Sequence, residues 1–93
     1  MLTVHRDYLS ITPAGQTKRI GQGMLLHAAE DRQGLGRIDI WYEVDTNTPT
    51  PVLARNFVII QTGETLTLPG YTYFTTVVMQ NGQIFHIYAQ YGF

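Results

Sequence analysis

The sequence predicts an all-β domain, a small antiparallel meander of about seven short strands that forms a compact sandwich or a partly open barrel. The composition is 44% hydrophobic and only 14% charged, and Tyr, Thr, Val and Ile are abundant, which is typical of folded sheet proteins. Apolar or alternating runs recur between Gly- and Pro-containing turns. The strongest hairpin signal is Asn81-Gly82, which separates two runs of β-branched and aromatic residues.

The 93 residues are expected to form one domain, residues 1–93. The net charge of −1 supplies no basic field for a phosphate backbone, so nucleic acid is not an expected partner. The absence of cysteine excludes disulfides and thiolate metal sites. We see no signal peptide and no apolar run of membrane-spanning length, so no membrane partner is expected and a reducing cytosol is favoured.

The N-terminal third predicts three strands. Residues 2–11 alternate loosely, and a Pro- and Gly-containing turn at residues 12–15 would let residues 16–20 pair back on the first strand. Residues 24–32 fit a short helix or a strand, and neighbouring strands favour the strand. As a strand, this segment would place Met24, Leu26 and Ala28 on one face. Leu25, His27 and Ala29 would lie on the other face.

The clearest strand spans residues 37–45, where apolar and polar residues alternate. After a proline loop at residues 46–51, residues 52–61 are expected to form a strand with little alternation. Its residues 57–60 are apolar on both faces, as in a central strand. A type I′ turn at Asn81-Gly82, with positive φ at both residues, would join the last two strands. The expected core residues are Ile38, Ile40, Tyr42, Val44, Phe57, Ile59, Val77, Ile84 and Ile87.

No enzyme signature is recognisable, and neither a cofactor nor a metal is expected. The three histidines lie in different strands without metal-ligand spacing, and His86 is expected to be a hydrogen-bonded, partly buried ring. The only serine, Ser10, lacks a nucleophile motif. Asp39, Glu43 and Asp45 share one face, which suits acid–base work or a cation. Alternating charges are also the ordinary solvent face of an antiparallel sheet, and this interpretation is favoured.

Aromatic and arginine side chains are the remaining candidates, because such residues anchor protein interfaces. Trp41 lies on the charged face, and Arg55 is placed to stack on it or to pair with a carboxylate. A sandwich also has a second inner face for aromatic rings; this alternative is favoured for Tyr73 and left open for Trp41. The candidate residues for binding a partner or a second copy are Trp41, Asp39, Glu43, Arg55, Tyr71 and Tyr73.

The order of strands and turns resembles a family of uncharacterised phage and prophage proteins. The likeness covers roughly residues 37–89 and is carried by Ile38-x-Ile40-Trp41-x-Glu43-Val44-Asp45, a proline loop, Arg55-x-Phe57-x-Ile59, Gln61-Thr62-Gly63-Glu64, Tyr73-x-x-Thr76 and Gly82-x-x-x-His86. The family's turn usually reads Gly-Thr-Gly-His, so a ligand role for its histidine does not carry over to Glu64.

The resemblance implies a small phage accessory protein in the host cytoplasm. Its expected partner is a host or phage protein, for example a host defence factor that it inhibits. The alternative is a structural or virion-associated domain that self-assembles. Edge strands of so small a sheet also offer a route to a homodimer.

Overall fold

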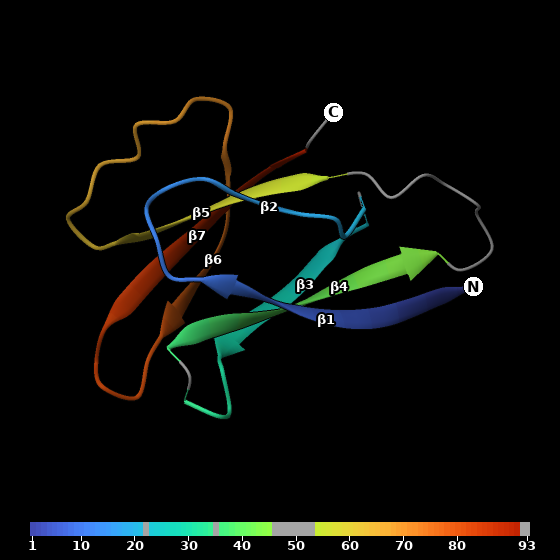
Figure 1. Cartoon of the computed structure of the whole chain (residues 1–93), viewed down its shortest axis with the longest axis horizontal. Coiled ribbons are helices and arrows are strands. Elements are labelled where there is room, and N and C mark those ends of the chain that lie inside the picture. Colours follow the sequence, from blue (N-terminus) through green and yellow to red (C-terminus); the bar gives the residue numbers. More distant parts are fainter. Residues whose placement is uncertain (22, 35, 46–53, 92–93) are drawn as a thin grey trace.

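A computed structural model describes residues 1–21, 23–34, 36–45 and 54–91 of the chain (Figure 1). Its strands form two antiparallel sheets, one ordered β1-β4-β3 and the other β2-β5-β7-β6. The prediction of an all-β fold of about seven strands is confirmed. Because the sheets do not close into a barrel, the sandwich is the architecture adopted of the two that were predicted. The strands are β1 (Leu2–Ser10), β2 (Gln16–Lys18), β3 (Leu25–Glu30), β4 (Arg37–Asp45), β5 (Arg55–Gln61), β6 (Thr72–Val78) and β7 (Ile84–Tyr91).

The first strand pairs with β4 and not with β2, so the predicted pairing of residues 16–20 on the first strand is wrong. β1 and β4 match in register along their whole length, from Leu2 opposite Asp45 to Ser10 opposite Arg37. After β1 the chain crosses to the other sheet, where the Thr12 carbonyl accepts a hydrogen bond from the Ile59 amide (3.3 Å). β2 then pairs with β5. The long β1–β4 ladder satisfies more backbone groups than a short local hairpin would.

β3 confirms the strand for most of residues 24–32, but its faces differ from the expected alternation. The register with β4 shifts between Leu25 and His27, which marks a β-bulge. An extra residue in one strand reverses the side on which the following residues point. As a result, Leu25 and Ala28 both pack against the core, and Leu26 is exposed.

The last hairpin is confirmed, but its turn is not type I′. Gly82 has positive φ (91°) and Asn81 does not. The Gly82 amide donates to the Met79 carbonyl (3.0 Å), and the Met79 amide donates to the Gln83 carbonyl (2.8 Å). This is the pattern of a three-residue loop with a bulge at a left-handed glycine. Asn81 contributes through its side chain, whose Oδ1 accepts from the Gln83 amide (3.0 Å).

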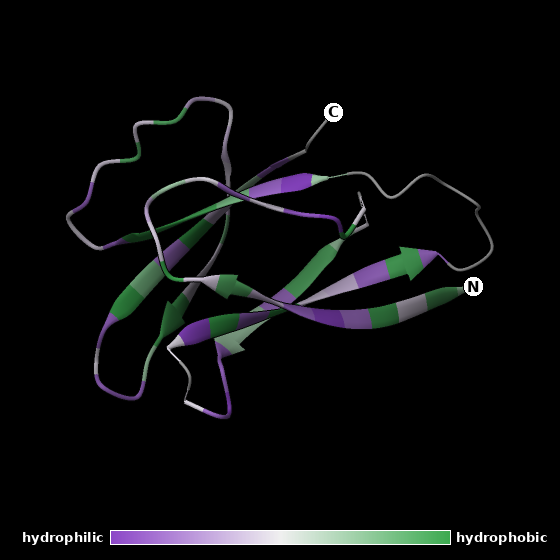
Figure 2. Cartoon of the chain, viewed as in Figure 1, coloured by the Kyte–Doolittle hydropathy of each residue, from purple (hydrophilic) through white to green (hydrophobic). Residues whose placement is uncertain are grey.

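The core lies between the two sheets. Figure 2 shows apolar residues alternating with polar ones along β4, so this strand turns one face inward. The prediction of Ile84 as a core residue is wrong. Ile84 is 40% exposed, and Phe85 points inward in its place. Val44 is partly buried against the core. The other predicted core residues are buried as expected: Ile38, Ile40, Tyr42, Phe57, Ile59, Val77 and Ile87.

Candidate functional site

The most distinctive surface is the outer face of the three-stranded sheet, the side of β1 and β4 that points away from the core. In the register, Arg6 lies opposite Trp41 and Tyr8 lies opposite Asp39. Directly opposed residues point to the same side of a sheet, and neighbouring residues in one strand point to opposite sides. Since Ile38 is buried in the core, these side chains share the outer face. Its members are Leu2, Val4, Arg6 and Tyr8 from β1 and Arg37, Asp39, Trp41, Glu43 and Asp45 from β4.

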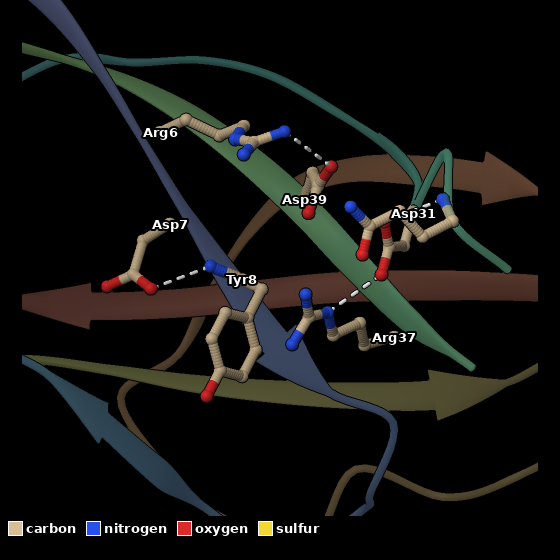
Figure 3. A network of polar contacts seen from close by, with 7 residues as sticks. Arg6, Asp7, Tyr8, Asp31, Arg37 and Asp39 are labelled. Atoms are coloured by element: carbon tan, nitrogen blue, oxygen red, sulfur yellow. Dashed lines mark hydrogen bonds and ion pairs between the residues drawn. The ribbon is translucent and has the colours of Figure 1, made fainter. Parts of the chain in front are cut away.

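Asp39 lies on the central strand of this face and is buried, so the expectation of a solvated carboxylate is wrong. It is only 3% exposed, because the central strand β4 places Tyr8 on one side of it and Ala29 on the other. Its Oδ2 lies 3.5 Å from Nη1 of Arg6 (Figure 3). Because that oxygen makes no hydrogen bond with the described residues, the Arg6 charge is the main compensation for burying it.

Asp31 and Arg37 form a second ion pair beside the first (Figure 3). Arg37 Nε donates to Asp31 Oδ2 at 2.7 Å, and the Gln33 amide donates to Asp31 Oδ1 at 3.0 Å. The guanidinium of Arg37 also lies 4.1 Å from the centre of the Tyr8 ring. The hydrogen bond from the Gln33 amide makes the largest contribution to lowering the pKa of Asp31 below 3.8, and Arg37 lowers this pKa further. Desolvation of the carboxyl acts in the opposite direction.

The lowered pKa predicts an acid-sensitive contribution to stability. Because the carboxyl has a lower pKa in the folded chain than in the unfolded chain, its ionised form stabilises the fold at neutral pH. This contribution is lost as the pH falls through the lowered value. We therefore expect Asp31→Asn to be less stable than the wild type at neutral pH and to lose less stability on acidification. Urea unfolding of both proteins between neutral and acidic pH measures this, and parallel pH profiles would contradict it.

The two ion pairs border a small hollow of about 200 Å³. Drug-sized ligands occupy pockets of about 300–1,000 Å³, so the hollow is small for a metabolite. Guanidinium and carboxylate groups both line it. Such an arrangement suits the charged side chains of another protein better than a ligand of one charge sign.

Trp41 is half-buried on this outer face. The sequence had left open whether its side chain is displayed or fills an inner face. Its ring lies 5.7 Å from that of His27 on β3, at an interplanar angle of 34°. On the β1 side, Leu2 (64% exposed) and Val4 (57% exposed) extend the apolar surface. The face thus combines an aromatic side chain with exposed aliphatic ones and a neighbouring charge cluster.

Glu43 and Asp39 lie on the same face as Trp41, but Arg55 does not. Arg55 is buried on the core side of β5, the same side of the strand as Phe57 and Ile59. Its Nη1 donates to the Gly23 carbonyl at 2.7 Å. The predicted stacking of Arg55 on Trp41 is therefore wrong, and among the described residues the pairing with Asp39 is made by Arg6 instead.

The two candidate tyrosines belong to the other sheet. Tyr73 is 53% exposed, with its ring 5.7 Å from that of Tyr88 and its hydroxyl 2.8 Å from the Thr76 hydroxyl. The interpretation that Tyr73 fills an inner face is therefore wrong. Tyr71 is half-buried just before β6, and its hydroxyl lies beside Gly15. These tyrosines do not extend the surface around Trp41.

His86 confirms the expectation of a hydrogen-bonded, partly buried ring. Its Nδ1 lies 3.0 Å from the Thr76 hydroxyl, and its Nε2 lies 2.8 Å from the Thr62 hydroxyl. Both ring nitrogens are thus used in holding β7 to its surroundings.

Arg6, Tyr8, Asp31 and Arg37 are the members of the site that sequence reasoning missed. The alternation of β1 places Arg6 and Tyr8 on one side, which is a usable signal. That signal becomes informative only when β1 is known to pair with β4, since Arg6 and Asp39 are far apart in the chain.

Comparisons with known proteins place the chain in a family without an assigned activity. No helix among the described residues is long and apolar enough to cross a membrane. No curated protein and no solved structure matches the chain significantly. The profile of one family, described as a domain of unknown function (DUF7352), matches residues 1–92. The chain therefore belongs to the DUF7352 family, an uncharacterised domain.

Proposed function

We propose that this domain is a protein-binding module that acts without catalysis, through the outer face of its three-stranded sheet. The observation that carries the proposal is Trp41, half-buried between the Arg6–Asp39 ion pair and the exposed aliphatic residues of β1. Binding energy in protein interfaces is concentrated in Trp, Tyr and Arg side chains with a rigid setting. Strand β4, flanked on both sides, supplies such a setting.

The charges on this face support a protein as the partner. Arg6 has a side chain that is 59% exposed, so its guanidinium can contact a carboxylate of a partner while it remains beside Asp39. Buried charge pairs at the centre of an interface contribute orientation and specificity. The mixed signs of the cluster match the surface of another protein better than a uniformly charged polymer.

The biological setting that we propose is a bacterial cell infected by a phage. The resemblance to phage and prophage proteins supports a phage-encoded accessory protein in the host cytoplasm that binds a host factor, such as a defence protein, and inhibits it. A structural, virion-associated domain that self-assembles is the second candidate. The open edge of β1 favours that alternative, because sheet edges pair readily with further strands.

An affinity pull-down from lysate of the bacterial host tests the proposed surface. We expect a captured protein whose binding weakens at least about 30-fold with Trp41→Ala, the loss typical of an interface hot spot. Tyr73→Ala is the matched control, since it removes an exposed aromatic ring from the other sheet. Circular dichroism of both variants establishes that they are folded.

Two results would contradict the proposed surface. Equal capture by the wild type and a folded Trp41→Ala variant would place the binding elsewhere. Co-sedimentation of the protein with purified phage particles, without a captured host protein, would move the virion-associated alternative to first place.

A further inference from the structure

β1 lies at one edge of the three-stranded sheet, and its backbone groups divide into two sets. On β4, the Glu43 amide and the Arg37 carbonyl both bond toward β3, at 2.9 Å and 3.0 Å. Backbone groups in an antiparallel ladder alternate between the two neighbouring strands. The backbone amide and carbonyl groups of the even-numbered residues of β4 therefore bond toward β1. The register places the odd-numbered residues of β1 opposite them. It follows that the even-numbered residues of β1 direct their amide and carbonyl groups toward the open edge.

The protein itself caps the C-terminal half of this edge. The Tyr8 amide donates to Asp7 Oδ1 at 2.7 Å. The side-chain amide of Gln16 satisfies both groups of Ser10, since its Oε1 accepts from the Ser10 amide (3.0 Å) and its Nε2 donates to the Ser10 carbonyl (2.7 Å). These contacts also show that the backbone groups of the even-numbered residues of β1 point toward the open edge. The edge groups of Leu2, Val4 and Arg6 make no such contact with the described residues.

We propose that this uncapped half of β1 pairs with the same segment of a second copy of the chain. The two segments would run antiparallel about a two-fold axis at Val4, with Leu2 of each copy opposite Arg6 of the other. All the edge groups of these three residues would then be hydrogen-bonded. The three-stranded sheets of the two copies would become one continuous sheet. The inference concerns the edge of the sheet and does not depend on what binds its outer face.

The side chains of the segment are complementary to a second copy. Val4 would meet Val4 at the axis, and the exposed Leu2 and Val4 of both copies would join into one apolar strip. Arg6 of the second copy would lie beside Leu2, whose neighbour on β4 is Asp45. The next residue on this face of β4 is Glu43, so each cation would approach two carboxylates.

Other registers about a two-fold axis fit less well. An axis at Arg6 would set two like charges against each other. An axis at His5 would pair Leu2 with Tyr8, whose amide is already bonded to Asp7. The Val4 axis uses only the uncapped groups. Because the ladder is short, the interface is of the small class that is typical of weak association, and we expect a reversible dimer in the micromolar range.

Cysteine cross-linking tests the register directly, because the natural chain contains no cysteine. Hydrogen-bonded antiparallel pairs have Cα atoms about 5.5 Å apart, which lies within the range that a disulfide spans. Val4→Cys should therefore form a disulfide-linked dimer under mild oxidation. Leu2→Cys is the matched control, since in this register the two copies of residue 2 would lie about 14 Å apart. We expect cross-linking of Val4→Cys at least about tenfold faster than of Leu2→Cys. Equal rates would overturn the register.

Sedimentation velocity over a range of protein concentrations tests the association itself. The wild type should show a reversible monomer–dimer equilibrium. Val4→Pro should be monomeric with an unchanged circular dichroism spectrum, since it removes an amide that faces the edge, where proline is tolerated. If that variant does not fold, Val4→Lys tests the same point by placing two ammonium groups at the axis. A wild type that stays monomeric up to millimolar concentration would overturn the proposal, as would a folded Val4 variant that dimerises like the wild type.

Discussion

Replacing Phe57 with alanine should remove most of the stability of this domain. Phe57 is fully buried, and it lies on β5 between β2 and β7, where its ring belongs to the core between the sheets. Truncation of a buried phenylalanine costs about 3–5 kcal/mol through lost burial and the cavity that remains. A whole domain is typically stable by only about 5–15 kcal/mol, and a small one buries a smaller share of its surface. Urea unfolding followed by circular dichroism measures the loss.

Val78→Ala is the matched control for that experiment. It also truncates an apolar strand residue, but Val78 is 67% exposed at the end of β6. We expect a change within about 0.5 kcal/mol. A Phe57→Ala variant that unfolds at nearly the same urea concentration as Val78→Ala would contradict the core described above.

Substituting alanine for Gly23 should produce the second large effect, through overlap of backbone atoms. A Cβ at this position would overlap the Glu43 carbonyl oxygen and lie 2.9 Å from the carbonyl carbon. Neither atom can move without disturbing β4, whose Glu43 amide is bonded to the Met24 carbonyl. The Gly23 carbonyl also accepts the hydrogen bond from Arg55. We expect a loss of about 3 kcal/mol in the free energy of unfolding, at the upper end for overpacking.

Gly21→Ala separates this overlap from the general cost of replacing a glycine. An added Cβ at Gly21 would meet no atom within 4 Å, but its φ of +76° strains an L-residue. That strain costs about 1–2 kcal/mol. In thermal and urea unfolding, the Gly23→Ala variant should be clearly less stable than the Gly21→Ala variant. A reversed order would mean that the chain before β3 does not approach β4 as closely as described.

The parts of the fold that sequence reasoning predicted correctly depend on local chemistry. The alternation in β4 predicted its buried face, because side chains in a strand point to opposite sides in turn. The position of the last hairpin followed from Asn81-Gly82. Its turn type did not, since the count of loop residues depends on where the ladder between β6 and β7 closes.

The candidate site was predicted only in part, because charges on a strand acquire their meaning from the neighbouring strands. Asp39, Trp41 and Glu43 were expected on one face, and they lie together on it. Nothing near Asp39 in the sequence indicates that it is buried or that Arg6 is its partner. Arg55 was expected to lie beside Trp41 or a carboxylate of β4, yet it is buried on β5 and bonds to the Gly23 carbonyl.

By itself, the sequence of this protein determined the all-β class, the course of the strands and the residues that turn toward the core in β4 and β5. Alternation, β-branched content and turn residues act over a few neighbouring positions, so they can be read locally. The tertiary structure alone decided that β1 pairs with β4, that a bulge reverses the faces of β3 and that Asp39 is buried beside Arg6. These features depend on pairing between distant segments, where the gain from satisfying a long ladder outweighs the local preference for a hairpin.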